Sequence, residues 1–301
     1  MARFWWLLKR SLIACHEDGC FGVAKGAAYS AILSFIPILT ALAAILVQVN
    51  AQRVSQIISQ FLFIAVPPGT EDLVQYSFTI RGERPIHLLV LATILSVWAA
   101  SGVMATMMEG FQAVYHLPGG RPFVKQRVVA ILLVFMAAAP VILGSSLLVL
   151  GDRVEKGVLQ ELGVIPAGEQ LRGWVVLVGI AARYLTSFSA IALAVAGLYY
   201  FGPNRRQRWS GVWPGALLAT FLWLFATVLF AWYVRNIANY NVMYGSVGAV
   251  MAMLVWMYVL SVVGLIGCEF NAELERYWLL QKEINNAAPV AAGAAEFRKV
   301  P

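Results

Sequence analysis

Long apolar runs separated by short polar stretches dominate the chain. A helix that crosses the hydrocarbon core of a bilayer needs about 20 consecutive, mostly apolar residues. Six runs reach that length, and they are too uniformly apolar for the amphipathic helices of a soluble protein. They cover residues 27–49, 87–108, 128–150, 174–201, 211–234 and 244–268. The pattern predicts an all-α fold, a polytopic membrane bundle of six transmembrane helices.

Two further segments predict helices that lie at a membrane surface. Phe4–Ile13 combines aromatic and leucine side chains with Lys9 and Arg10, which is typical of a helix on the inner surface. Gln52–Val66 repeats apolar side chains at helical spacing before Pro67. We expect this second segment to form an interfacial or re-entrant helix on the outer side.

The composition agrees with a membrane protein. Hydrophobic residues make up 60% of the 301 and charged residues only 12%, whereas soluble domains carry about 25% charged residues. No hydrophilic stretch exceeds about 40 residues, and so short a stretch rarely holds a core alone. We expect one transmembrane domain over residues 1–280 and a disordered cytoplasmic tail over residues 281–301.

The basic residues predict how the bundle is oriented. The net charge is +7, and its Lys and Arg residues cluster at the ends of the apolar runs. The N-terminal segment, the second and fourth loops and the C-terminal tail hold fourteen of them, against seven in the alternate segments. Because cytoplasmic loops carry the excess of Lys and Arg, both termini are expected inside. This topology accounts for the basic charge, so we expect no nucleic-acid partner.

Arg183 is the strongest local anomaly, because it lies near the middle of the fourth span. An arginine there costs at least about 2.5–3.5 kcal/mol on insertion scales, so it must face a polar cavity, a carboxylate or backbone carbonyls. Thr186 and Ser187 add polar groups nearby. The functional interpretation is a contact with an anion or a lipid phosphate, and the alternative is a structural pair that fixes packing.

Glu109, Glu269 and Asn271 are candidates for a second polar site, at the inner ends of their helices. The alternative is that both glutamates simply end their helices at the water interface. In the first span, Tyr29 and Ser34 place polar groups beside Pro37, which is expected to kink the helix. A kinked helix with polar groups can line a pathway or serve as ordinary packing.

Small residues and prolines suggest structural roles in the fifth span, and no pattern predicts a metal or a cofactor. Gly211 and Gly215 fit the G-x-x-x-G spacing for close helix contact, beside Pro214. Cys15, His16 and Cys20 match no standard zinc spacing. No nucleotide-binding or hydrolase motif is present either.

Several strings resemble the YihY/BrkB family of bacterial inner-membrane proteins over residues 5–280. The sequence departs from the family pattern at Cys268, where alanine is expected. The resemblance implies six spans, both termini in the cytoplasm and no settled activity, although the family carries ribonuclease and virulence designations. The matching strings are Ala27–Ser30, Ser34–Pro37, Trp98–Gly102, Tyr200–Arg206, Trp213–Ala216, Tyr244–Ala249 and Gly267–Glu273.

The matched strings also indicate local roles. Gly245 and Gly248 open the sixth span with small residues that permit close backbone approach. Pro203 is expected to stop the fourth helix. The basic residues that follow, Arg205, Arg206 and Arg208, are expected to meet anionic lipid headgroups of the inner leaflet.

Three functions remain open from the sequence. The first is a transporter or flippase-like protein for a lipid or another anionic, amphipathic envelope substrate, suggested by Arg183 and its polar neighbours. The second is a non-transporting scaffold for envelope assembly, suggested by the absence of an energy-coupling motif. The third, a membrane enzyme, has the least support, because no cluster of metal-binding side chains stands on a soluble segment. We therefore expect no enzyme.

If Arg183 is functional, Arg183→Leu should insert into the membrane normally and lose activity, because leucine removes the charge without disturbing an apolar span. Native mass spectrometry of protein extracted with its surrounding lipid would compare the variant with the wild type. A well-expressed variant with the same bound lipid and the same phenotype would leave Arg183 as a packing residue.

Overall fold

The computed structural model describes residues 2–48, 86–161, 173–236 and 245–297. This part of the chain is helical apart from short turns and contains no strand. The predicted helix Gln52–Val66 lies outside it. The helices are α1 (Ala2–Glu17), α2 (Cys20–Gln48), α5 (Ile86–Val114), α6 (Phe123–Glu161), α7 (Gly173–Phe201), α8 (Trp209–Asn236) and α10 (Gly245–Phe297).

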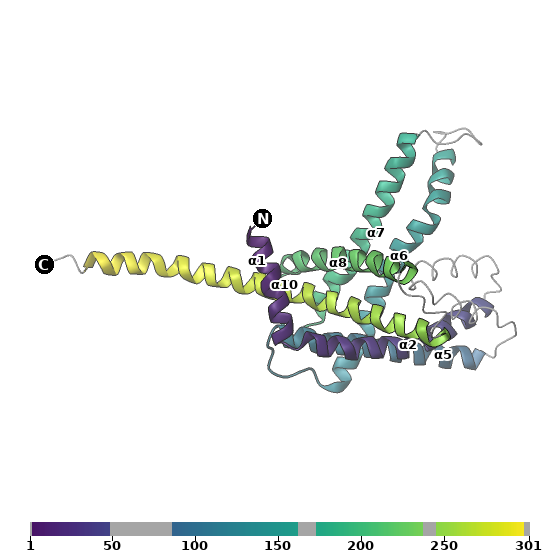
Figure 1. Ribbon diagram of the computed structural model, residues 1–301, viewed down its shortest axis with the longest axis horizontal. Coiled ribbons are helices and arrows are strands. Elements are labelled where there is room, and N and C mark those ends of the chain that lie inside the picture. Colours follow the sequence, from purple (N-terminus) through teal and green to yellow (C-terminus); the bar gives the residue numbers. More distant parts are fainter. Residues whose placement is uncertain (1, 49–85, 162–172, 237–244, 298–301) are drawn as a thin grey trace.

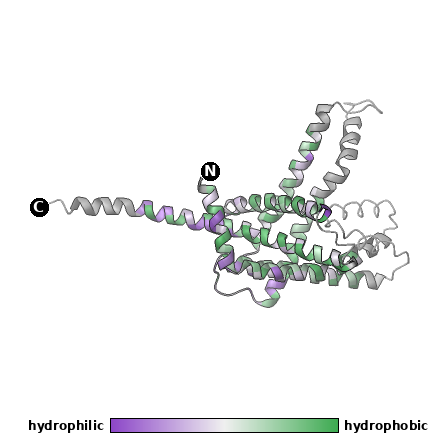
Figure 2. Cartoon of the chain, in the orientation of Figure 1, coloured by the Kyte–Doolittle hydropathy of each residue, from purple (hydrophilic) through white to green (hydrophobic). Residues whose placement is uncertain are grey.

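The predicted spans are confirmed, because six of the described helices are long and apolar enough to cross a membrane. Figure 2 shows apolar residues along these helices and polar residues gathered where α1 meets α10. The helices begin earlier or end later than the apolar runs. For example, α2 starts at Cys20 rather than near Ala27. A helix satisfies its backbone hydrogen bonds internally, so it need not stop at the membrane boundary.

The C-terminal segment differs from the prediction of a disordered tail. Helix α10 runs without interruption to Phe297, so residues 281–297 are helical. This segment is rich in alanine, which has the highest helix propensity. It also continues a helix that already exists, so it does not bear the cost of nucleation. Small residues alone therefore did not indicate disorder here.

Packing divides the bundle into neighbouring pairs. Helix α2 runs beside α5, α6 beside α7, and α10 beside α8, while α10 also contacts α2 and α1. Figure 1 shows α6 and α7 diverging together from the other helices, and α1 crossing α10. The first of these pairs is joined at Pro37, because the Ser96 hydroxyl of α5 donates to the Pro37 carbonyl at 2.6 Å.

We call the part of the bundle where α1 crosses α10 the α1 end. The α5–α6 loop (residues 115–122) and the α7–α8 loop (residues 202–208) also lie there, since the Arg121 guanidinium bonds to the Gly202 carbonyl at 2.8 Å. The largest buried apolar cluster draws on α1, α2, α5, α7, α8 and α10. The α1 end is therefore the best packed part of the described chain.

Helices α8 and α10 approach each other closely at Gly215 and Gly267. A Cβ atom on Gly215 would collide with the Gly267 carbonyl oxygen and come within 2.6 Å of the Asn271 side chain. Gly211, the other glycine of the G-x-x-x-G spacing, has no such neighbour within 4 Å. The spacing thus marks a contact within this chain, and only its second glycine makes it.

Gly215→Ala should therefore destabilise the bundle, by about 1–3 kcal/mol, because the added methyl group overpacks a contact that includes rigid backbone. Thermal unfolding of the purified protein in one detergent would measure the effect. Gly211→Ala is the matched control and should unfold like the wild type. Equal unfolding temperatures for both variants would contradict the close packing of α8 and α10.

Candidate functional site

Charged side chains of α10 gather in two stripes at the α1 end. Residues four and then three apart lie on one face of a helix. Glu269, Glu273 and Arg276 form one stripe by this rule, and they face α1 and the end of α5. Asn271, Glu275 and Trp278 form the other stripe, and they face the α7–α8 loop and the start of α8. The same helix therefore presents polar groups to two sides.

The first stripe forms an ion-pair network. Arg276 contacts Glu273 at 2.6 Å and Glu269 at 3.4 Å, and it donates to the Val114 carbonyl at 2.7 Å. Arg10 of α1 contacts the other carboxylate oxygen of Glu273 at 2.5 Å. Since Val114 ends α5, this network joins α1, α5 and α10.

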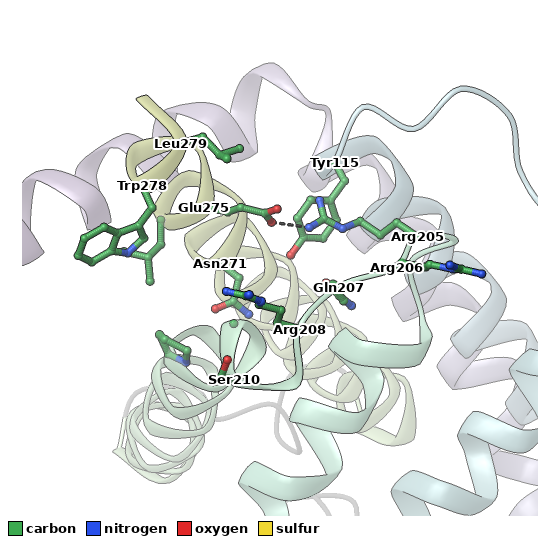
Figure 3. Close-up of a pocket in the computed structure, with 13 residues that line it drawn as sticks. Tyr115, Arg205, Arg206, Gln207, Arg208, Ser210, Asn271, Glu275, Trp278 and Leu279 are labelled. Atoms are coloured by element: carbon green, nitrogen blue, oxygen red, sulfur yellow. Dashed lines mark hydrogen bonds and ion pairs between the residues drawn. The ribbon is translucent and has the colours of Figure 1, made fainter. Parts of the chain in front are cut away.

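The second stripe lines a cavity of about 720 Å³ between α10, the α7–α8 loop and the start of α8. Three arginines of the loop, Arg205, Arg206 and Arg208, line this cavity. Figure 3 shows Arg205 directed at Glu275, whereas Arg206 points away from α10. Trp278 and Leu279 of α10 form an apolar wall, and both side chains are more than half exposed. The cavity thus combines concentrated positive charge with apolar surface.

Arg205 has the closest contacts of the three arginines in the described part of the chain. It forms an ion pair with Glu275, and its guanidinium lies 4.1 Å from the centre of the Tyr115 ring. Burial raises the pKa of the Tyr115 phenol, so this ring stays neutral and suited to stacking on a cation. Arg206 and Arg208 are exposed. One arginine is therefore held in place and two can adapt to a ligand.

Hydrogen bonds from side chains to backbone carbonyls shape the loop that carries these arginines. Helix α7 ends at Phe201, and Pro203 follows it, as the sequence predicted. Arg121 donates to the carbonyls of Phe201, Gly202 and Pro203. The last carbonyls of a helix lack partners in the helix, and a cation is favoured beside them. Arg121 thereby fixes the start of the α7–α8 loop.

Comparison with known proteins agrees with this description. The model of the family described as virulence factor BrkB matches residues 13–291, which is most of the chain. The chain belongs to the BrkB family. The match includes the six spans and both stripes of α10. The resemblance found in the sequence is thus confirmed.

The relatives carry two kinds of name. A UPF0761 membrane protein of Tolumonas auensis is 24% identical over 276 residues, which cover 88% of this chain and 84% of that protein. One from Psychromonas ingrahamii is 24% identical over 93% of this chain and 90% of its own. YfkH of Bacillus subtilis, named as ribonuclease-like, is 27% identical over 63% of this chain and 66% of its own. No solved structure matches the chain.

The BrkB-family chain brings some of the sequence-derived candidates together. Glu269 and Asn271 lie on the two stripes of α10, and Asn271 lines the same cavity as Arg205, Arg206 and Arg208. Glu109 is exposed and accepts a hydrogen bond from Gln126 at 3.4 Å, outside the Arg276 network. The two glutamates therefore do not share a site.

The Asn271 side chain forms hydrogen bonds to the backbone of α8. Its Oδ1 atom accepts from the Gly215 amide at 2.6 Å, and its Nδ2 atom donates to the Val212 carbonyl at 3.0 Å. Pro214 lies between these two residues in the first turns of α8. Asn271 thereby ties α10 to the backbone on both sides of this proline.

The candidates on α7 lie far from the cavity. At 1.5 Å per residue, Arg183 is about 27 Å along the helix from Phe201. Its Nε atom donates to the Gly179 carbonyl of the same helix at 3.3 Å. Thr186 donates to Ala182, also within α7, whereas Ser187 donates to the Gly144 carbonyl of α6 at 2.7 Å. These groups contact backbone in the structure.

The candidate polar residues of α2 also lie outside the cavity. The Ser34 hydroxyl is buried and donates to the Ala31 carbonyl, whereas Tyr29 is exposed. Neither residue lines the cavity beside the arginines. Near the start of this helix, Cys15 and Cys20 are buried but His16 is exposed, so these three side chains do not converge.

Gly245 and Gly248 open the sixth span. Helix α10 begins at Gly245, and Gly248 is buried. Both residues lie far along α10 from the cavity, since Asn271 is 23 residues beyond Gly248 in the same helix. They therefore take no part in the site at the α1 end.

Sequence reasoning missed several residues of this site, chiefly Arg10, Tyr115, Glu273, Glu275 and Arg276. A signal was present in the spacing of charged residues after the sixth span, because two helical stripes can be read from Glu269 to Trp278. The partners of those stripes could not be read in this way. Arg10 lies 263 residues from Glu273, and only the fold brings them together.

Asn271→Ala should lower the stability of the bundle, because it leaves the Gly215 amide and the Val212 carbonyl without their partner. Each buried polar group left unpaired costs about 1–3 kcal/mol. Thermal unfolding in detergent would measure the loss. Asn236→Ala is the control, since Asn236 is exposed and bonds only to the Trp232 carbonyl of its own helix among the described contacts. Similar effects of both substitutions would contradict the role of Asn271.

Proposed function

We propose that this protein binds an anionic, amphipathic envelope molecule, such as a phospholipid or a lipid-linked precursor, and moves it across the membrane. The observation that carries the proposal is the 720 Å³ cavity with three arginines on one side and Trp278 and Leu279 on the other. The comparisons support the coarser statement that it is a multi-pass membrane protein of the BrkB family. The proposal assigns it no enzymatic reaction.

Arginine and apolar surface suit the two ends of such a molecule. The guanidinium group matches phosphate in a bidentate geometry and is less strongly hydrated than an ammonium group. Among the described residues, Glu275 is the one carboxylate that lines the cavity, and it is paired with Arg205. Arg206 and Arg208 can therefore bind a phosphate without repulsion from an unpaired carboxylate. An acyl chain would lie along Trp278 and Leu279.

The position of the cavity favours a lipid over a water-soluble anion. It lies at one end of the apolar helices, where the predicted cytoplasmic loops meet the bilayer. We propose that the α1 end faces the cytoplasm and that the membrane is a bacterial inner membrane. Helix α1 would rest on the inner surface, because Phe4, Trp5 and Trp6 are all exposed.

A scaffold that does not transport is the second candidate, and a specific observation favours it. Ser34, Thr186, Ser187 and the Nε atom of Arg183 all donate to backbone carbonyls. Polar groups that are satisfied in this way need no water-filled path through the bundle. In that case the cavity would hold a permanently bound lipid rather than a transported substrate.

Native mass spectrometry would test whether the cavity binds lipid. The full-length protein would be extracted from nanodiscs that contain phosphatidylethanolamine and phosphatidylglycerol. Arg206→Gln with Arg208→Gln should weaken retention of phosphatidylglycerol about tenfold or more, because hydrogen bonds to charged groups are worth about 1.5–3 kcal/mol each. Retention of phosphatidylethanolamine should change less.

The matched control is Lys125→Gln. Lys125 is exposed at the start of α6, on the same predicted side of the membrane, and does not line the cavity. It therefore removes a basic charge without touching the site. Equal loss of phosphatidylglycerol in the control would show that general surface charge, and not the cavity, retains this lipid. No loss in the double variant would overturn the proposed site.

A further inference from the structure

Glu269 is a fully buried carboxylate that the lipid cavity does not use. Its side chain is 0% exposed, although it is a charged residue type. One oxygen, Oε1, lies 3.4 Å from the Arg276 guanidinium. The other, Oε2, is buried and has no hydrogen-bond partner in the described part of the chain. A buried, unpartnered carboxylate oxygen is costly unless something binds to it.

Unlike Glu269, the neighbouring Glu273 has a close ion pair on each of its carboxylate oxygens. Glu273 is 4% exposed and has one short ion pair on each oxygen, to Arg276 at 2.6 Å and to Arg10 at 2.5 Å. Arg276 therefore contacts Glu273 closely and Glu269 only at the longer distance. Of the two carboxylates, Glu269 is the one that can take a proton without breaking a close ion pair.

A second cavity lies next to the partners of this carboxylate. It has a volume of about 570 Å³ and lies between α1 and α10. Glu273 and Arg276 line it together with Arg10, Asp18 and His116. Glu269 itself does not line this cavity. The Arg276 side chain, which is 32% exposed, both lines the cavity and contacts Glu269, so it connects the two.

Titratable groups surround Glu269 from every element packed against it. Asp18, in the turn between α1 and α2, also has a buried oxygen without a hydrogen-bond partner among the described residues, and its other oxygen lies 3.7 Å from His116. Among the described residues, these groups are Cys15 from α1, Asp18 from the turn, Cys20 from α2, Tyr115 after α5, and Cys268, Glu273 and Arg276 from α10. Arg276 is the one cation in this set.

We propose that Glu269 is a proton-binding site, loaded from the cavity between α1 and α10. The proton adds to the unpartnered Oε2 atom and converts the carboxylate to a neutral acid. Arg276 then has a single anionic partner, Glu273. The proton comes from water in the cavity and returns there, so no other reactant is needed.

Protonation at this position would change a contact that joins three helices. Arg276 connects α10 to the end of α5 through the Val114 carbonyl, and Glu273 connects α10 to α1 through Arg10. Weakening the Glu269–Arg276 attraction alters the balance of forces on that junction. This part of the inference rests on the proposed transport function, for which it names the proton as the coupling ion.

Infrared difference spectroscopy would test proton binding directly. The full-length protein in nanodiscs of phosphatidylethanolamine and phosphatidylglycerol would be titrated from alkaline to acid pH. The wild type should gain a carboxylic-acid C=O band of a buried group. Glu269→Gln should lose that band, whereas the control Glu283→Gln should keep it, because Glu283 is exposed on the same helix. A band unchanged in Glu269→Gln would overturn the proposal.

A second variant covers the case in which Glu269→Gln does not fold. Glu269→Asp keeps the carboxyl group but moves it away from Arg276, so the band should remain with its titration midpoint shifted. An identical midpoint in Glu269→Asp would overturn the proposal as well. The titration requires no bound substrate, so its failure would not contradict the proposed lipid cavity. Conversely, unchanged lipid binding in the arginine variants would not contradict the proposed proton site.

Discussion

The close approach of α8 and α10 is the contact on which the site depends. Without side chains at Gly215 and Gly267, the two backbones come near enough for Asn271 to bond across to α8. That contact sets the start of α8, and the start of α8 sets where the preceding loop can lie. Arg205 of this loop then reaches Glu275 of α10. Packing of small residues in the apolar part thus determines the electrostatics at its edge.

The charges at this edge are arranged according to how deeply they lie. Exposed ion pairs contribute little, because water screens them and long side chains lose freedom. Buried charges require partners, and Glu273 has two. Glu269 lies deeper and has only a distant one. The gradient from exposed Arg206 and Arg208 to buried Glu269 places both proposed sites, the one for an anion and the one for a proton, at one end of the bundle.

The sequence predicted the six spans because a bilayer imposes a length and a composition that can be read directly. It also predicted that α7 ends before Pro203, since proline lacks the amide that continues a helix. It was wrong about residues 281–297, where alanine extends an existing helix. The site was predicted only in part. Glu269, Asn271 and the three loop arginines could be singled out, but the partners Arg10, Tyr115 and Arg121 come from distant segments that carry no local signal.

The structure also explains why one conspicuous arginine proved a poor guide to the cavity. In an apolar span every polar group must find a partner, and the backbone carbonyls of the same helix are always within reach. Arg183 and Thr186 both use that route. A polar residue inside a span is therefore compatible with packing as well as with function. At the α1 end the buried acidic groups cannot bond to carbonyls, because both accept hydrogen bonds, so they pair with arginines and Glu269 is left incompletely paired. An incomplete pair at a packed junction, rather than an isolated charge, is the feature that points to binding.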